Sequence, residues 1–169
     1  PKIVTIPVGS LDQLTYPKEP RKPYSMITAS RLATEKHIDW LVAATVQAQT
    51  QLPELTLDIY GKGGEEDKLR HRIEEAGAQG YIRLKGHADL SQIYAGYELY
   101  LTASTSEGFG LTLMEAVGSG LPLIGFDVRY GNQTFIDDGK NGYLLAVSSN
   151  HVEDQIIAAF VEKIVALFS

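Results

Sequence analysis

The sequence predicts an α/β fold, a doubly wound parallel sheet of Rossmann-like type, because two kinds of segment alternate along it. Short apolar runs rich in β-branched and aromatic residues alternate with longer segments in which apolar residues recur at helical spacing. Alternation of this kind is typical of βαβ units, whose crossovers are right-handed and whose strands are parallel. The 169 residues suffice for one domain with a full-sized core.

The expected elements follow one another in a regular order. Residues 1–23 show little periodicity and are punctuated by proline, so we expect them to form a linker. After the linker we expect strands at 24–29, 55–60, 81–84, 99–103, 121–126 and 143–147. Between and after the strands we expect helices at 37–51, 65–76, 89–94, 111–117, 132–136 and 151–168. Asp89 and Asn150 are the expected N-caps of the third and the last of these helices.

Composition and charge exclude several classes of protein. Apolar residues make up 44% of the chain, which excludes a disordered protein. The net charge of −6 argues against nucleic-acid binding, which needs a positive surface. No apolar run approaches ~20 residues, and the first residues lack the pattern of a signal peptide. The chain has no cysteine, so disulfides and thiolate metal sites are excluded, and we expect a reducing, cytoplasmic location.

Residues that carry chemistry follow four of the expected strands. Arg31 follows the first strand, and Gly61 follows the second. His87 follows the third, and Glu107 follows the fourth. Ligands of doubly wound sheets bind outside the carboxyl ends of the strands. We therefore expect the binding site at this edge of the sheet.

The segment 106–115 is the most informative part of the chain. Gly108 and Gly110 let the backbone approach a ligand closely, and a helix that begins near Gly110 has free N–H groups that favour a phosphate. Glu115 lies inside that helix and is expected to accept hydrogen bonds from ribose hydroxyls. Glu107 is expected to accept them from a transferred sugar. The alternative is a capping acid followed by a solvated helix glutamate.

Arg31 and Lys36 form a second group of candidates. Arg31 lies in the loop after the first strand, and Lys36 lies just before a helix. Two cations here would hold a diphosphate without a metal, Arg31 as a bidentate fork and Lys36 as a point charge. The alternative is that both are solvated surface cations.

Other segments carry weaker signals. Gly61-Lys62-Gly63-Gly64 is either a tight turn or a point of close approach to a nucleotide, and it lacks the P-loop pattern. His87 either borders a base or is structural. Tyr94, Tyr97 and Tyr100 are expected to pack in the core. None of the four histidines is spaced from another as metal ligands are, so we expect no metal.

Four segments together resemble a known family. They are Ala29-Ser30-Arg31-Leu32 with Glu35-Lys36, Ile59-Tyr60-Gly61-Lys62-Gly63, Glu107-Gly108-Phe109-Gly110-Leu111 with Glu115-Ala116, and Gly139-Lys140-Asn141-Gly142. Over residues 3–147 the chain is similar to the C-terminal, donor-binding domain of GT-B retaining glycosyltransferases of family 4. Many members have glycine after the lysine, where this chain has His37, so we expect a different helix start.

The resemblance implies a role for each matching residue. Arg31 and Lys36 would grip the donor diphosphate and would form the catalytic set together with Glu107. Glu115 would hold the ribose. The base would be bordered by His87 and Ala88. The remaining substrate-binding residues are Gly108, Phe109, Gly110, Leu111 and Thr112, which would meet the sugar and the phosphates. The resemblance implies no cofactor or metal, since such enzymes are usually metal-independent, and the absence of an Asp-x-Asp segment agrees with this.

Within the family, the stretch 125–132 is similar to the bacterial branch that transfers N-acetylglucosamine from a UDP-sugar to Ser or Thr of serine-rich repeat adhesins before accessory Sec export. The resemblance implies a homologous, non-catalytic glycosyltransferase-like subunit as partner. A poly(glycerol-phosphate) α-glucosyltransferase is one alternative, and a non-catalytic binding subunit is another. A nicotinamide-dependent oxidoreductase is disfavoured, because the third glycine of the dinucleotide pattern is missing.

GT-B enzymes place the donor and the acceptor on separate domains. The resemblance therefore implies that residues 24–169 form the nucleotide-sugar-binding domain, that 1–23 lead into it, and that the N-terminal acceptor domain is absent. We expect this domain alone to bind the donor without useful turnover. Any peripheral membrane association would come through the missing domain.

Overall fold

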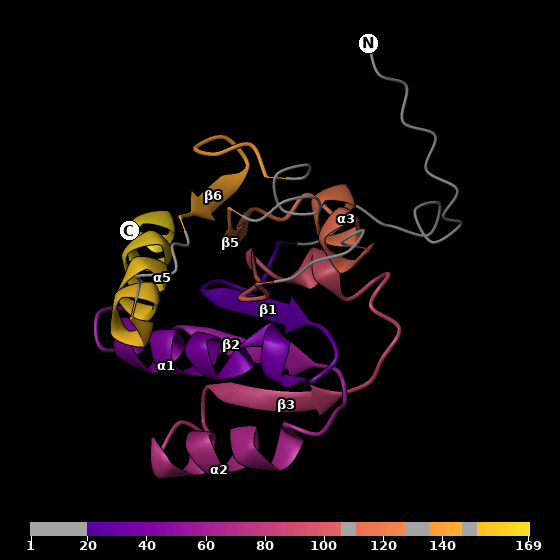
Figure 1. Cartoon of the computed structure of the whole chain (residues 1–169). Coiled ribbons are helices and arrows are strands. Elements are labelled where there is room, and N and C mark those ends of the chain that lie inside the picture. The colour runs from indigo at the N-terminus through magenta and orange to yellow at the C-terminus, as the bar shows by residue number, and fades with distance from the viewer. Residues whose placement is uncertain (1–19, 106–110, 128–135, 147–151) are drawn as a thin grey trace.

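The structure of the chain, a computed structural model, describes residues 20–105, 111–127, 136–146 and 152–169 (Figure 1). Within them, a six-stranded parallel sheet has the order β3-β2-β1-β4-β5-β6. The strands are β1 (Ser25–Ala29), β2 (Thr56–Tyr60), β3 (Ile82–Gly86), β4 (Leu99–Leu101), β5 (Leu123–Phe126) and β6 (Gly142–Leu145). This is the strand order of a Rossmann-like doubly wound sheet, so the predicted fold class is confirmed.

Helices cover both faces of the sheet. They are α1 (Ile38–Gln49), α2 (Glu66–Glu75), α3 (Leu111–Gly118) and α5 (Glu153–Phe168), with the short 3₁₀ helices η2 (Thr34–Lys36) and η3 (Tyr94–Gly96). α1 contacts both α2 and α5, and these three helices share one apolar core with the sheet. α3 and η3 belong to a second core on the opposite face (Figure 1). None of the helices described is long and apolar enough to cross a membrane.

β1 is the central strand and is buried along its whole length. Successive side chains of a strand point to opposite faces, so Met26 belongs to the first core and Ile27 to the second. A strand covered on both faces needs no polar alternation, which is why a short, mostly apolar run predicted it correctly.

One predicted helix, at 89–94, is wrong. The chain there forms turns and then η3, which begins only at Tyr94. The Asp89 carboxylate accepts a hydrogen bond from the backbone N–H of Ser91 at 3.0 Å, and this contact lowers the pKa of Asp89 below its ordinary value. This contact is the kind that an N-cap makes, but the backbone that follows is closed mostly by hydrogen bonds three residues apart, from Ile93 to Leu90 and from Gly96 to Ile93, so turns and a 3₁₀ helix form in place of an α-helix.

The other differences concern the ends of elements. β4 ends at Leu101 rather than at residue 103, and α5 begins at Glu153 with Val152 in the N-cap position. The backbone N–H of Val152 donates to the side-chain oxygen of Gln155 at 3.4 Å. Asn150 and most of the predicted helix at 132–136 lie outside the described residues.

The strand order reverses between β1 and β4, and this reversal positions the site. β1 pairs with β2 along its full length, from Ser25 opposite Thr56 to Ala29 opposite Tyr60. Its pairing with β4 stops at Ile27, which lies opposite Tyr100. The carboxyl end of β1 is therefore open on the β4 side, and such a switch point is where doubly wound sheets bind ligands.

Candidate functional site

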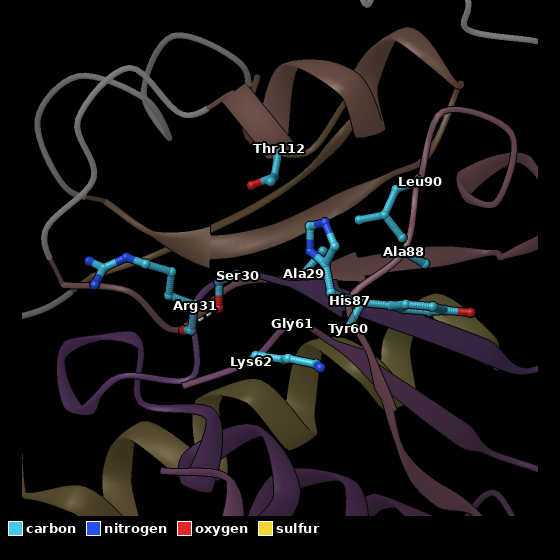
Figure 2. Close-up of a pocket in the computed structure, with 10 residues that line it drawn as sticks. All are labelled: Ala29, Ser30, Arg31, Tyr60, Gly61, Lys62, His87, Ala88, Leu90 and Thr112. Carbon is cyan, nitrogen blue, oxygen red and sulfur yellow. Dashed lines mark hydrogen bonds between the residues drawn. The ribbon is translucent and has the colours of Figure 1, made fainter. Parts of the chain in front are cut away.

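A cavity of about 370 Å³ lies at the carboxyl ends of β1, β2 and β3, below the first turn of α3 (Figure 2). Its volume falls in the range of small-molecule sites. It is lined by Ala29, Ser30, Arg31, Tyr60, Gly61, Lys62, His87, Ala88, Leu90 and Thr112. Figure 2 shows the rings of His87 and Tyr60 toward one end, near Ala88, and the guanidinium of Arg31 toward the other.

The cavity brings together residues that the sequence placed after three separate strands. Arg31, Gly61 and His87 all line it, and so do the predicted site residues Ala88 and Thr112. The predicted residues Glu107, Gly108, Phe109 and Gly110 lie outside the described residues, as does the side chain of Leu111.

Arg31 projects from the loop after β1, and its side chain is 74% exposed. Its guanidinium donates a hydrogen bond to the carboxylate of Glu35 at 3.1 Å. The pKa of Glu35 is lowered, chiefly by a hydrogen bond from its own backbone N–H, and further by the charges of Arg31 and Lys36. Lys36 ends η2 and is half-buried, and it is not among the residues that line the cavity. Arg31 and Lys36 thus act on one neighbouring carboxylate, while Arg31 alone of the two borders the cavity.

The loops after β1 and β2 are held together by backbone contacts. The Leu32 N–H donates to the Lys62 carbonyl at 2.9 Å, and the Glu65 N–H donates to the Leu32 carbonyl at 2.9 Å. A Cβ on Gly61 would lie 1.8 Å from the carbonyl oxygen of Ser30, and one on Gly63 would lie 2.4 Å from that of Leu32. Gly61 also has a φ of +132°, which favours glycine. Gly61 and Gly63 therefore allow the loop after β2 to pack closely against the loop after β1. The alternatives considered from the sequence were only a tight turn or close approach to a nucleotide.

The ring of Tyr60 has a buried hydrogen-bond network behind it. The Tyr97 hydroxyl donates to the carboxylate of Asp58, a β2 residue that is only 8% exposed. The hydroxyls of Tyr60 and Tyr97 lie 3.4 Å apart. Burial, and then the hydrogen bond to Asp58, raise the pKa of Tyr97 well above its ordinary value. The Tyr97 phenol therefore stays neutral and can donate to the buried carboxylate of Asp58. Without this donor, burial of the Asp58 carboxylate would cost free energy.

Across the cavity, the first turn of α3 is tied to the end of β1 through Tyr100. The Tyr100 hydroxyl lies 2.9 Å from the carbonyl oxygen of Ala29 and 3.2 Å from the hydroxyl of Thr112. The buried phenol of Tyr94 lies close enough to Glu115 for the two side chains to interact electrostatically. Within the described residues, its hydroxyl makes no hydrogen bond of normal geometry. Burial, then Tyr100 and Glu115, raise the pKa of Tyr94 far above its ordinary value.

His37 connects η2 to α1 in a left-handed conformation, with φ 46° and ψ 41°. Its ring stacks on Trp40 at a centroid distance of 3.7 Å and an interplanar angle of 7°. Glycine adopts this backbone conformation without strain, so histidine in the place of glycine does not require a different helix start.

Several cavity residues were missed by sequence reasoning. Tyr60, Lys62 and Leu90 line the cavity, but no role was assigned to them. The position of Tyr60 as the last residue of a strand was a usable signal, whereas nothing in the sequence indicated its network. Among the residues described, no group of three or more His, Cys, Asp or Glu is placed to hold a metal ion.

Comparison with known proteins places the chain in a family. The family model for glycosyl transferases group 1 matches residues 15–164. The UDP-N-acetylglucosamine–peptide N-acetylglucosaminyltransferase GtfA subunit of Streptococcus gordonii is 95% identical over 169 residues, which are 100% of this chain and 33% of that protein. The chain therefore spans about a third of that relative's length.

Two solved structures match over nearly the whole chain. The crystal structure of the pneumococcal O-GlcNAc transferase GtfA in complex with UDP and GlcNAc is 70% identical, with a TM-score of 0.92 over 99% of this chain and 33% of that one. A GtfA/B complex is 95% identical, with a TM-score of 0.91 over 100% of this chain and 34% of that one. On the breadth of the family match and on these identities, the chain belongs to the glycosyl transferases of group 1.

Proposed function

We propose that this chain is the donor-binding domain of a GT-B retaining glycosyltransferase that transfers N-acetylglucosamine from UDP-N-acetylglucosamine to Ser or Thr of a serine-rich protein. One observation carries the proposal: a single cavity at the switch point of the sheet has an aromatic end at Tyr60 and His87 and a cationic end at Arg31. A nucleoside diphosphate has a matching arrangement, since its base is flat and uncharged and can stack on rings, whereas its phosphates are anionic. The pneumococcal relative, crystallised with UDP and GlcNAc, supports this ligand class.

In the proposed reaction, the bond between the anomeric carbon and the diphosphate oxygen breaks, and a hydroxyl oxygen of the acceptor bonds to that carbon with retention. The O–H bond of that hydroxyl breaks, and its proton passes to the departing diphosphate. The electron pair of the broken C–O bond stays on the diphosphate. Arg31 and Lys36 would stabilise this developing charge, and we propose that they do so without a metal. Glu107, Gly108, Phe109 and Gly110 would contact the sugar and phosphates, and Glu115 the ribose.

The acceptor and the partner are proposed on the relatives rather than on the cavity. The GtfA relatives, at 95% and 70% identity, favour a peptide acceptor over poly(glycerol-phosphate). The GtfA/B complex supports a homologous partner subunit. We propose that the acceptor domain lies in the two thirds of the relatives' length that this chain does not span, and that the enzyme works in the cytoplasm.

Calorimetry on the 169-residue chain tests the donor site. We expect heat of binding and a higher Tm with UDP and with UDP-N-acetylglucosamine, and neither with NADH. The absence of both signals with both uridine ligands would overturn the proposal.

A transfer assay on the full-length protein with its partner subunit tests the acceptor. It should glycosylate a serine-rich peptide and leave poly(glycerol-phosphate) unmodified. Donor binding without transfer to either acceptor would favour a non-catalytic binding subunit, the second candidate.

A further inference from the structure

Arg21 joins two separate parts of the fold from the edge of the sheet opposite the cavity. Its guanidinium donates one hydrogen bond to the Tyr97 carbonyl at 2.6 Å and another to the Ser119 carbonyl at 2.7 Å. Arg21 precedes β1, Tyr97 follows η3 and precedes β4, and Ser119 follows α3 and precedes β5. All three therefore lie at the amino-terminal ends of parallel strands, and Arg21 does not line the cavity.

Arginine is suited to this double contact. Its guanidinium is a planar fork that carries several N–H donors, so it can hold two carbonyl oxygens in a fixed relation to each other. Arg21 is half-buried, burial lowers the pKa of its guanidinium, and the charge of nearby Glu98 opposes that shift. Hydrogen bonds from a charged donor are stronger than neutral ones. The Ser119 carbonyl also lies at the carboxyl end of a helix, where cations are favoured.

The backbone next to Arg21 is held as well. The Lys22 N–H donates to the Gly96 carbonyl at 3.0 Å, and the Tyr24 N–H donates to the Glu98 carboxylate at 2.8 Å. Arg21 is therefore attached to a fixed segment, and its fork transmits the position of that segment to Tyr97 and Ser119.

Both elements held by Arg21 reach the cavity at their other ends. The Tyr97 hydroxyl lies 3.4 Å from that of Tyr60, which lines the cavity. α3 has eight residues and is therefore about 12 Å long, with Ser119 after its last turn and Thr112 in its first. Figure 2 shows Thr112 and Tyr60 on opposite sides of the cavity.

α3 has less support than the helices on the other face of the sheet. It packs chiefly on β5, whereas α1 packs on both α2 and α5. A single contact at the carboxyl end of α3 can therefore decide how the helix is tilted over the cavity.

We propose that Arg21 is a positioning residue for the donor, which fixes the spacing between the aromatic end of the cavity and α3 without touching the ligand. The inference rests on the proposed function. A nucleoside diphosphate extends from the aromatic end to the phosphate site, so its affinity depends on that spacing. Pyrophosphate has no base, and the exposed side chain of Arg31 can follow a shift of α3, so its affinity does not.

The first test compares these two ligands on the full-length protein. By calorimetry, we expect Arg21→Gln to bind UDP about tenfold more weakly and pyrophosphate within about twofold of the wild type. Arg21→Lys keeps the charge, but its single nitrogen cannot hold both carbonyls as a fork, so UDP affinity should fall about threefold. This milder variant carries the test by itself if Arg21→Gln does not fold.

Ser25→Ala is the matched control. The Ser25 hydroxyl donates to the Lys22 carbonyl at 2.6 Å, so the variant loses a hydrogen bond at the same edge of the sheet that reaches neither α3 nor Tyr97. Its affinities for UDP and for pyrophosphate should equal those of the wild type, even if its stability falls.

The second test observes α3 directly through amide hydrogen exchange. The Ser119 N–H donates to the Glu115 carbonyl at 3.0 Å, and the Gly120 N–H donates to the Val117 carbonyl at 2.9 Å. Without the Arg21 contact the end of α3 should open more often, so both amides should exchange about tenfold faster in Arg21→Gln. They should be unchanged in Ser25→Ala, and the amides of α1 should be unchanged in both variants.

Wild-type binding of UDP reports on the proposed function, and only the variants report on this inference. UDP affinity that is unchanged in both Arg21 variants would overturn it. An equal loss for UDP and pyrophosphate would also reject it, because that pattern means a damaged fold. Unchanged exchange at Ser119 and Gly120 would show that α3 is held by other contacts, and Arg21 would then have no positioning role.

Discussion

The two walls of the cavity are built differently. The β1–β2 wall, formed by residues 30–32 and 60–65, is held by backbone hydrogen bonds and by glycines pressed against carbonyl oxygens. The α3 wall is held by side-chain hydroxyls, with Tyr100 between Ala29 and Thr112. A wall held by backbone contacts should tolerate most side-chain substitutions, but it should be destabilised when its glycines are replaced. A hydroxyl-built wall should respond to the loss of a single oxygen atom.

We expect the largest effect from a substitution at Gly61, which should disrupt the β1–β2 wall. A Cβ there would lie 1.8 Å from the Ser30 carbonyl oxygen, with φ at +132°. We expect Gly61→Ala to lower the free energy of unfolding by about 4 kcal/mol or more, measured by urea denaturation. Gly64→Ala is the matched control, because a Cβ there meets nothing within 4 Å. Similar stabilities of the two variants would contradict the backbone-built wall.

The next largest effect removes the cation from the same wall. In the full-length protein, Arg31→Ala should reduce kcat/KM about 10²-fold or more, equivalent to roughly 2.7 kcal/mol, because the diphosphate loses its guanidinium. Stability should hardly change, since Arg31 is 74% exposed. The exposed Arg70, paired with Glu66 on α2, supplies the control Arg70→Ala, which should keep full activity. An unchanged rate for Arg31→Ala would remove Arg31 from the mechanism.

A third variant asks whether the β1–β2 wall also depends on hydroxyls. Tyr97→Phe removes the donor to buried Asp58, and we expect a loss of about 2 kcal/mol of stability. The pKa of Tyr97 is raised on folding, so the stabilisation it gives is fully present below the pKa of a free tyrosine, about 10, and is lost as the pH rises above it.

The deficit of Tyr97→Phe should therefore stay constant from about pH 7 to pH 9 and narrow only in more alkaline solution. Tyr81→Phe, a half-buried tyrosine outside this network, is the control. A deficit no larger than that of Tyr81→Phe would mean that Asp58 does not depend on the phenol.

The smallest effect concerns His37, where the β1 loop joins α1. His37→Ala loses the stack on Trp40 and keeps an unfavourable left-handed backbone, so we expect a loss of about 1 kcal/mol. His37→Gly loses the same stack but gains a relaxed backbone, so its stability should stay within about 0.5 kcal/mol of the wild type. Thermal unfolding separates the two, and an Ala variant as stable as the Gly variant would refute the backbone argument.

Much of the fold was predictable because its signals are local. The strand at β1 followed from an apolar run, and α1 followed from the spacing of Ile38, Leu41 and Val42. The prediction at 89–94 failed because the backbone from Leu90 onward is closed mostly by hydrogen bonds three residues apart, which give turns and a 3₁₀ helix. The edge of the sheet that carries Arg31 and His87 was also predictable, since parallel strands place their carboxyl ends together.

By itself, the sequence determined the order of strands and helices, the edge where the site lies, and several side chains that line it, because hydrophobic periodicity and chain direction are properties of neighbouring residues. Only the tertiary structure decided that Gly61 meets Ser30, that Tyr97 stands between Asp58 and Tyr60, and that Tyr100 links Ala29 to Thr112. These pairs lie on different strands and helices. Their chemistry exists only once the sheet has brought them within hydrogen-bonding or van der Waals distance, and no local pattern encodes that approach.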